Sequence, residues 1–302
     1  MTEPLILAVP SKGRLKEQVE AWLADCRLDL AAAGGSRGYL GALKGLPEVQ
    51  VRLVSAGEIA EAVDAGDVHL GVTGEDLLRE RGGDVEQRVL LLRPLGFGRA
   101  DLVVAVPKSW LDVDDMADLE EVAHDVLART GRRMRVATKY LVQTRAFFAR
   151  HGVADYRIVE SGGATEGAPA AGAAELVVDI TTTGSTLAAN GLKVLADGVI
   201  LKSQAQLMAS LRASWSADQL RTAERFLRVV EARAAALQTA SLVWPGGPDG
   251  EVTRDRLPLG EVAAAAAALT AKGVGPVSSY RSDFVFQTDS PSFDALKGIV
   301  LT

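Results

Sequence analysis

The stretch at residues 166–187 reads EGAPAAGAAELVVDITTTGSTL, and its second half sets a pattern that the rest of the chain repeats. Residues 176–180 form a short apolar run, which is typical of a buried β-strand. Residues 181–186 then place five hydroxyl side chains around Gly184. Such hydroxyls and the backbone N–H groups beside a glycine can enclose a phosphate, although a threonine-rich capped turn would use the same residues. Asp179, just before the turn, is placed to hold ribose hydroxyls, so the stretch indicates a sugar phosphate.

Short apolar runs alternate with amphipathic segments along the first 215 residues. This alternation is typical of an α/β fold, in which ligands bind beyond the carboxyl ends of the strands. The composition changes near residues 93–96, and an apolar segment at 200–209 is suited to return to the first unit. We therefore expect two α/β lobes that face a cleft, with residues 1–93 and 187–215 in lobe I and residues 94–186 in lobe II. The expected strands are 5–9, 51–54, 68–72, 102–106, 135–137, 156–159 and 176–180, and the expected helices are 14–25, 57–65, 122–129 and 142–150.

The pattern changes from about residue 216, where Ser216 is positioned to cap a long amphipathic helix at 217–238. A loop at 245–250 is rich in proline and glycine. The remaining segments predict a strand at 240–244, a helix at 259–272, strands at 277–280 and 283–287, a short helix at 292–297 and a strand at 298–302. The order β-α-β-β-α-β predicts a small α+β domain of ferredoxin-like type at residues 216–302.

The length, charge and cysteine content of the chain limit the classes of protein to which it can belong. The 302 residues leave room for two or three domains, and the net charge of −6 argues against nonspecific nucleic-acid binding. The single cysteine, Cys26, excludes an intramolecular disulfide. The N-terminus has no basic start with a small-residue cleavage pattern, and no run reaches the roughly 20 apolar residues of a membrane helix, so we expect a cytoplasmic protein. The three histidines, His69, His124 and His151, are scattered and lack metal-ligand spacing.

Two further turns carry residues suited to a ligand. Ser11-Lys12-Gly13-Arg14 lies between the first strand and the first helix. Two cations and a glycine at a helix N-terminus suit an anion, and a solvated polar turn is the alternative. Thr73-Gly74-Glu75-Asp76 follows the third strand and is placed either to line the cleft or to cap a helix.

Taken together, these stretches resemble the ATP phosphoribosyltransferases, the family that catalyses the first step of histidine biosynthesis. The family signature begins with a glutamate, has a glycine six residues later and ends in an acidic residue followed by a T-G-x-T-L loop. Three other stretches agree, LAVPSKGRL at 7–15, GVTGEDLL at 71–78 and VATKYLVQTRAFF at 136–148, so the resemblance spans about residues 5–210. The signature is met by Glu166, Gly172, Ala174, Val177, Asp179, Ile180, Thr183, Gly184, Thr186 and Leu187.

The resemblance implies a core of two lobes like that of type II periplasmic binding proteins. It also implies a reaction that joins N1 of ATP to C1 of phosphoribosyl pyrophosphate and releases pyrophosphate, with Mg²⁺ held mainly by substrate phosphates and without a protein nucleophile. The ribose and its 5-phosphate are then expected at Glu166, Asp179, Thr182, Thr183, Gly184, Ser185 and Thr186. The nucleotide or the pyrophosphate is expected at Lys12, Gly13, Arg14, Thr73, Gly74, Asp76, Lys139 and Tyr140.

Two departures from the family pattern leave alternatives open. The family has an Arg-x-x-Asp-Ile-Pro stretch after the second strand, whereas this chain reads SAGEIA from Ser55, so a cation expected at the cleft is missing and Arg52 lies three residues earlier. The tail matches the family's regulatory domain in element order only, which leaves open inhibition by histidine and a histidyl-tRNA-synthetase-like regulatory subunit. The resemblance also implies assembly into a homo-oligomer. A two-lobed small-molecule-binding protein without catalysis, or a paralogue that uses another nucleotide, are the alternative functions.

Overall fold

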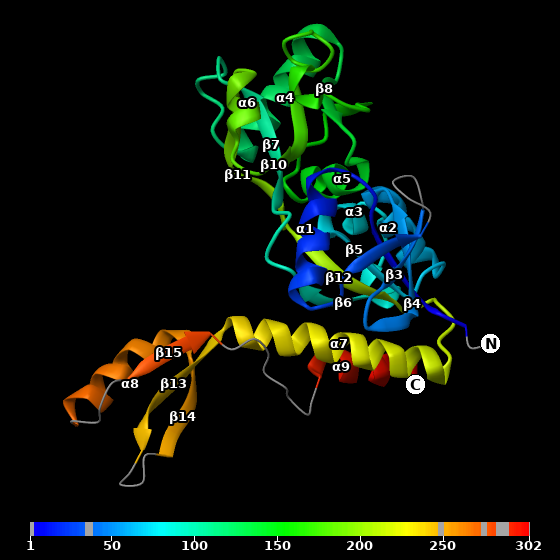
Figure 1. Ribbon diagram of the computed structural model, residues 1–302. Coiled ribbons are helices and arrows are strands. Elements are labelled where there is room, and N and C mark those ends of the chain that lie inside the picture. The colour runs from blue at the N-terminus through cyan, green and yellow to red at the C-terminus, as the bar shows by residue number, and fades with distance from the viewer. Residues whose placement is uncertain (1–2, 34–38, 247–250, 273–276, 282–289, 302) are drawn as a thin grey trace.

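Two α/β lobes stand one above the other, and a long helix with a small sheet lies below them (Figure 1). The computed structural model describes residues 3–33, 39–246, 251–272, 277–281 and 290–301. In this part of the chain, no helix is both long and apolar enough to cross a bilayer.

Lobe I is built on a seven-stranded sheet in the order β2-β3-β4-β1-β5-β12-β6. Its strands are β1 (Leu5–Pro10), β2 (Leu30–Ala33), β3 (Leu40–Leu43), β4 (Leu46–Val54), β5 (Leu70–Gly74), β6 (Val89–Pro94) and β12 (Ala205–Ser210). One face packs on α1 (Gly13–Asp25), and the other packs on α2 (Ala56–Ala65) and α3 (Glu75–Arg79). Both faces are therefore covered, which explains why the central strands are almost wholly apolar.

Lobe II is built on a five-stranded sheet in the order β11-β7-β10-β8-β9. Its strands are β7 (Ala100–Pro107), β8 (Met134–Thr138), β9 (Tyr156–Glu160), β10 (Leu176–Thr181) and β11 (Leu192–Ser203). Helices α4 (Met116–Thr130) and α5 (Leu141–Arg150) bury their apolar residues on one face. On the other face Leu187 of the short helix α6 (Ser185–Ala189) packs against the sheet.

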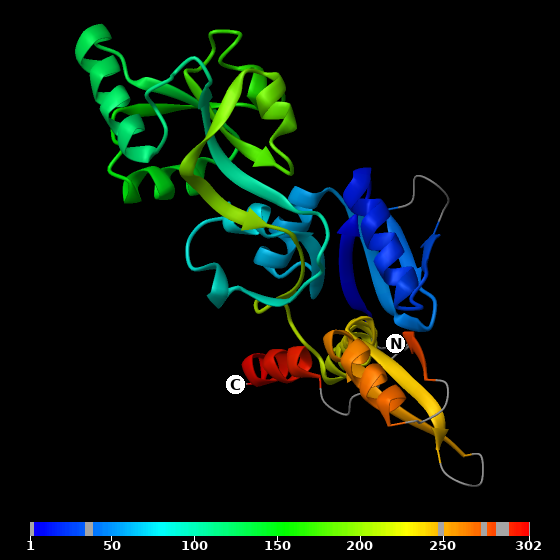
Figure 2. The same ribbon diagram turned by 90° about the vertical axis from the view of Figure 1, so that its left-hand side faces the viewer.

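Two chain crossings join the lobes, from β6 to β7 and from β11 to β12 (Figure 2). The expected return to lobe I at residue 187 is wrong, because β11 pairs antiparallel with β7 from Leu192 to Ser203 and so belongs to lobe II. The return occurs at β12, which pairs antiparallel with β5 and β6. β12 is buried throughout, whereas β11 alternates buried and exposed residues, and only the pairing of each strand assigns it to a lobe.

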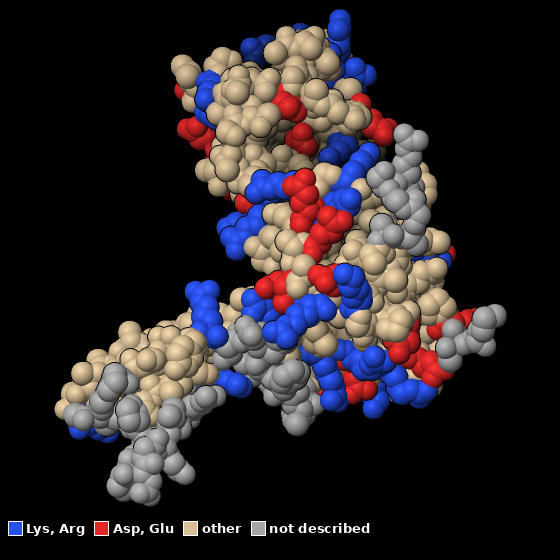
Figure 3. All heavy atoms as spheres, viewed as in Figure 1, with Lys and Arg blue, Asp and Glu red and all other residues tan. Residues whose placement is uncertain are grey.

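The long helix α7 (Ala217–Leu237) belongs to the core of lobe I. Ser216 caps it as expected, in a reciprocal capping box with Gln219. The helix buries Phe226, Leu227 and Val230 against the same cluster as β1 and β4. Acidic and basic side chains intermix along this side of lobe I and α7 (Figure 3), and ion pairs such as Arg225–Glu48 and Arg233–Asp25 join the two.

The small domain beyond α7 differs from the expected ferredoxin-like order. Its described strands are β13 (Thr239–Gly246), β14 (Glu251–Pro258) and β15 (Ser278–Arg281), in the sheet order β14-β13-β15, with α8 (Leu259–Ala271) between β14 and β15. The sequence did not predict β14, which is strongly charged and pairs with β13 along its full length. The expected strand at 283–287 falls outside the described residues.

Helix α9 (Pro291–Val300) contains the short helix expected at 292–297, and it continues where a final strand at 298–302 was expected. Ser290 caps the helix and Pro291 occupies its first turn. Phe293 and Leu296, spaced at helical periodicity, are buried in the lobe I core, and Ser292 donates hydrogen bonds to Glu231 of α7 (3.0 Å from its backbone N) and to Leu92 O of β6 (3.3 Å). The small domain is therefore inserted between two helices that both pack on lobe I.

His69 and Cys26 serve the fold. The backbone N–H of Ile6 donates to His69 Nδ1 (3.1 Å), so the opposite ring nitrogen carries the proton and donates to Ser214 O (3.1 Å). Burial lowers the pKa of His69, which keeps this ring neutral. Burial also raises the pKa of the Cys26 thiol to about 12, so this thiol at the end of α1 is unreactive.

Candidate functional site

A cavity of about 670 Å³ lies between the lobes and collects residues from several strand ends. Arg14 follows β1, Gly74 and Asp76 follow β5, Lys139 and Tyr140 follow β8, and Thr182 follows β10. Turns that were separate in the sequence thus meet beyond the carboxyl ends of their strands, as expected for α/β proteins. The full lining is Arg14, Leu15, Gln18, Ala56, Gly74, Asp76, Leu77, Gly96, Phe97, Gly98, Arg99, Ala100, Lys139, Tyr140, Ile180 and Thr182.

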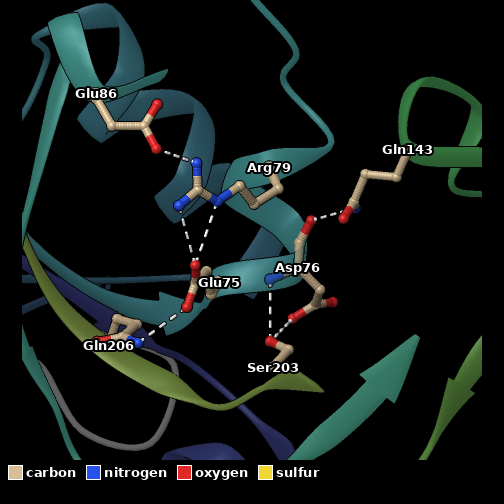
Figure 4. Close-up of polar contacts among 7 residues, drawn as sticks. All are labelled: Glu75, Asp76, Arg79, Glu86, Gln143, Ser203 and Gln206. Carbon is tan, nitrogen blue, oxygen red and sulfur yellow. Dashed lines mark hydrogen bonds and ion pairs between the residues drawn. The ribbon is translucent and has the colours of Figure 1, made fainter. Parts of the chain in front are cut away.

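The carboxylate of Asp76 ties the two lobes together at this cavity. The side chain is 5% exposed, and Tyr140 of lobe II, 1% exposed, donates its hydroxyl proton to Oδ2 (2.7 Å). Ser203, at the end of β11, donates to Oδ1 (2.8 Å) and accepts from the Asp76 backbone N–H (3.0 Å; Figure 4). Burial, followed by the neighbouring Asp76 charge, raises the pKa of Tyr140, so the phenol stays protonated and remains a donor.

A second set of hydrogen bonds joins α3 to the first turn of α5. Glu80, at the end of α3, accepts from the backbone N–H groups of Val142 (2.8 Å) and Gln143 (3.1 Å). The Gln143 amide donates to Asp76 O (2.9 Å; Figure 4). A carboxylate of lobe I therefore caps a helix of lobe II, where the free N–H groups favour negative charge. We call these contacts of Asp76 and Glu80 with Tyr140, Val142, Gln143 and Ser203 the interlobe latch.

Helix α3 is itself fixed to the lobe I sheet by its charged side chains. Glu75 accepts from Arg79 Nε and Nη2, both at 3.2 Å, and from the Gln206 amide of β12 at 3.0 Å (Figure 4). Arg79 also pairs with Glu86. Since α3 has only five residues, these contacts hold it against the lobe I sheet, so the latch joins that sheet to lobe II.

Hydrogen bonds from its own residues hold the shape of the hydroxyl-rich turn after β10. Gly184 has φ +73° and its N–H donates to Thr181 Oγ1 (2.8 Å). Thr183 and Ser185 share a hydrogen bond between their hydroxyls (2.9 Å), and Thr182 Oγ1 donates to Arg99 O (3.1 Å). No atom lies within 4 Å of the place where a Cβ at Gly184 would stand. The turn therefore has a left-handed glycine that faces open space, with exposed hydroxyls on either side.

Two carboxylates lie beside this turn. Burial raises the pKa of Asp179, and the nearby Glu166 acts in the same direction, while a hydrogen bond from the Ile180 N–H (2.8 Å), the charge of Lys139 and a bond with Thr165 act against it. A carboxylate that is partly desolvated beside another acid is costly for the fold, and such sites are frequently functional.

Not every residue of the predicted site reaches the cavity. Thr73 is fully buried and donates to Ala56 O (2.8 Å), which ties β5 to α2. Lys12 and Gly13 precede Arg14 at the start of α1 without lining the cavity, and Gly13 adopts φ +75°. The sequence reasoning missed residues 96–99, which lie in the crossing between lobes, because their glycines read as a domain boundary.

Ser55, where the family pattern has arginine, caps α2. Its Oγ accepts from the Glu58 N–H (3.3 Å) and its own N–H donates to Glu58 Oε2 (2.8 Å), a reciprocal capping box. Arg52 donates to Asp67 O (3.2 Å) and does not line the cavity. At the position where the family pattern has arginine, this chain therefore has a residue that caps a helix.

Replacing Ser55 by alanine is expected to lower the free energy of unfolding by about 1 kcal/mol, because the first turn of α2 loses its side-chain acceptor. Chemical denaturation followed by tryptophan fluorescence measures the change. Ser109→Ala is the matched control, since Ser109 is exposed and has no side-chain hydrogen bond in the described structure. Equal stability of the two variants would contradict the assigned cap.

Within the described residues, no cluster of three or more His, Cys, Asp or Glu side chains is arranged to hold a metal ion.

Comparisons with known proteins agree on one family. The family model described as "HisG: ATP phosphoribosyltransferase" matches residues 55–231. The chain is 64% identical to the ATP phosphoribosyltransferase of Caulobacter vibrioides, with 97% of each chain covered. It is 51% identical to that of Nitrobacter winogradskyi, with 100% of each covered. Among solved structures, a chain of the ATP phosphoribosyl transferase (HisG:HisZ) complex from Thermotoga maritima shares the fold, with a TM-score of 0.58 and 24% identity over 75% of this chain and 96% of that one.

Proposed function

The chain belongs to the ATP phosphoribosyltransferase family, and we propose that the cavity between its lobes is where the two substrates of this family meet. The reaction is the first step of histidine biosynthesis, in which N1 of ATP is joined to C1 of phosphoribosyl pyrophosphate and pyrophosphate leaves. The observation that supports this site best is the meeting of four strand ends in one cavity, with Arg14 on the lobe I side and Thr182 on the lobe II side.

The turn after β10 is the proposed site of the ribose 5-phosphate. Gly184 leaves room for close approach, and the hydroxyls of Thr182, Thr183, Ser185 and Thr186 are exposed on the turn. Asp179 and Glu166 then face the ribose hydroxyls, which are donors to carboxylates. The desolvation of Asp179 supports this assignment, since hydroxyl donors and a developing positive charge at C1 would both stabilise its anion.

The nucleotide is proposed to bind on the other side of the cavity. Arg14, Gly74, Lys139 and Tyr140 line it and leave about 670 Å³ of space, within the size of small-molecule sites. The latch positions the lobes so that the adenine N1 lies in line with the ribose C1, and this alignment is the main contribution of the protein to a reaction without a protein nucleophile. Lys12 and Gly13 stay in the proposal as neighbours of Arg14, whereas Thr73 supports the wall from behind.

Mg²⁺ is proposed as the cofactor. The ion is expected to be held mainly by oxygens of the substrate phosphates, because Glu166 and Asp179 are assigned to the ribose hydroxyls and the described residues contain no cluster arranged to hold a metal ion. Bound there, it would neutralise charge on the pyrophosphate.

Incubation of the whole chain with ATP, phosphoribosyl pyrophosphate and Mg²⁺ is expected to yield phosphoribosyl-ATP and pyrophosphate, measured by mass spectrometry and a coupled pyrophosphate assay. Turnover with GTP in preference to ATP would identify a paralogue for another nucleotide. Binding of both ligands without any turnover would instead identify a binding protein, and either result would overturn the proposal.

Regulation by histidine and assembly of several copies are proposed to act through the small domain, which projects away from the lobes (Figure 1). A chain cut at residue 215 would be a poor test, because α7 and α9 complete the lobe I core. Titration calorimetry of histidine into the whole chain, with light scattering for its mass, is the better measurement. Absence of histidine binding would favour control by a separate histidyl-tRNA-synthetase-like subunit.

A further inference from the structure

The chain segment that crosses from β6 to β7 holds an unassigned cation, Arg99. Gly96 N–H donates to Gln204 Oε1 (3.2 Å), and the Ala205 N–H donates to Phe97 O (3.0 Å). Thr182, of the turn after β10, donates to Arg99 O (3.1 Å). The backbone that carries Arg99 is thus fixed to the second crossing and to the proposed phosphate turn.

Close packing fixes the same segment from the lobe I side. Gly98 has φ +62°, and a Cβ there would lie 3.0 Å from Leu15 Cδ1 and 3.3 Å from Ala205 Cβ. A larger residue would be strained and would push the crossing away from α1. The position of the Arg99 backbone therefore depends on this glycine.

Arg99 borders two cavities. The first is the interlobe cavity, and the second, of about 420 Å³, lies beside it and shares Arg99, Ala100 and Thr182 with it. The second cavity is lined by Arg99, Ala100, Asp101, Thr181, Thr182, Lys202, Ser203 and Gln204.

Strand register places the second cavity next to the proposed ribose site. Asp101 of β7 lies opposite both Thr181 of β10 and Lys202 of β11, so these three side chains share one face of the lobe II sheet. Asp179, two residues before Thr181, is on that same face. A group leaving the sugar at Asp179 would thus move along this face toward Lys202 and Arg99.

The charges in the second cavity suit an anion. Arg99 and Lys202 contribute two positive charges against the single carboxylate of Asp101. Within the described chain, neither the Arg99 nor the Lys202 side chain has a hydrogen bond or an ion pair. Two cations without partners, beside the Thr181 hydroxyl, which accepts from the Gly184 N–H and keeps its own proton to donate, are arranged to receive phosphate oxygens.

We propose that Arg99, with Lys202 beside it, binds the pyrophosphate as it leaves C1, and so supplies the cation that Ser55 does not. This inference rests on the proposed function of the cavity. In the transfer, the C1–O bond breaks and its electron pair leaves with the pyrophosphate oxygen, while the lone pair of the adenine N1 forms the new bond to C1. The negative charge that develops on the leaving oxygen is then met by the guanidinium, whose planar fork can hold two phosphate oxygens.

The test compares Arg99→Gln with Arg99→Lys, Lys202→Gln and the control Arg157→Gln. The control removes an exposed arginine of β9, which is the strand at the opposite edge of the lobe II sheet from β11 and lines neither cavity. Pyrophosphate binding to each protein is measured by calorimetry, and kcat and the KM for ATP by steady-state kinetics. Arg99→Gln is expected to weaken pyrophosphate binding and to lower kcat about tenfold or more, with Arg99→Lys retaining part of both and the KM for ATP nearly unchanged.

Unchanged pyrophosphate affinity in Arg99→Gln, or a change only in the KM for ATP, would overturn the inference while leaving the transferase function intact. Failure of the unmodified chain to form phosphoribosyl-ATP would instead overturn the proposed function. An equal loss in Arg157→Gln would show a general effect of charge and would also contradict a specific subsite.

Discussion

Asp179→Asn is expected to lower kcat/KM for phosphoribosyl pyrophosphate about 10²–10³-fold, without loss of thermal stability. The magnitude is that of removing one group that stabilises charge in a transition state. Stability is expected to hold or rise, because burial raises the pKa of Asp179 and the folded chain carries this charge at a cost. A residue that weakens the fold but is needed for turnover is characteristic of a functional site.

The pH dependence of stability and of turnover follows from the raised pKa of Asp179. A carboxyl group with a raised pKa in the folded state stabilises the fold most below its unfolded pKa, and this contribution is lost as pH rises through the folded pKa. Turnover that requires the anion should accordingly fall on acidification at a higher pH than an ordinary aspartate, near 3.9, would cause. A kcat/KM profile measured on the whole chain reports this acid limb.

Asp112→Asn is the matched control, because Asp112 is exposed in lobe II and has no partner in the described structure. Differential scanning fluorimetry gives the midpoint of each variant. Turnover of Asp179→Asn close to that of the control, or a clearly lower midpoint, would remove Asp179 from the site.

Asp76→Ala is expected to destabilise the chain by about 3 kcal/mol, because Tyr140 and Ser203 each lose a charged acceptor in a buried place. The lobes lose their shared carboxylate, so the angle between them should vary more widely. Small-angle scattering is expected to show a larger radius of gyration, and turnover should fall because the substrates are no longer held in line.

A double-mutant cycle separates the latch from a general loss of packing. Tyr140→Phe removes only the hydroxyl, and the Asp76→Ala/Tyr140→Phe double variant should cost less than the sum of the two single variants, since both remove the same bond. Arg145→Ala, at an exposed side chain of α5 outside the latch, is the control that should add independently. Additive effects of Asp76 and Tyr140 would show that the latch does not couple the lobes.

The regular part of the fold was predictable because its strands and helices follow each other with clear periodicity. Helices α1, α2, α5 and α7 lie within one residue of their predicted bounds, whereas α4 begins six residues before its predicted start at residue 122. The hairpin β2–β3 was missed, because its alanines and glycines give no alternation of apolar and polar residues. The short helix expected at 292–297 lies within α9, whereas the strand expected at 298–302 was wrong because α9 continues to Val300.

From the sequence, the candidate site could be predicted only where all its residues lie in a single turn. The turn around Gly184 can be recognised from its local composition, a run of threonine and serine around one glycine. Its role as a phosphate site stays a prediction. The bond between Asp76 and Tyr140 joins residues 64 positions apart, and no local pattern reports such a pairing. Arg99 was hidden for another reason, since a glycine-rich crossing resembles a linker until both cavities beside it are seen.

Helix α9 returns the chain to lobe I, and this return affects how the sequence can change during evolution. Both ends of the small domain are fastened to lobe I, α7 through Phe226 and Val230 and α9 through Phe293 and Leu296. A protease cut within the small domain would leave two fragments that remain associated through these helices. By the same geometry, the segment between them can be lengthened, shortened or exchanged during evolution while the residues around the interlobe cavity keep their places, so the small domain and the two lobes are free to diverge at different rates.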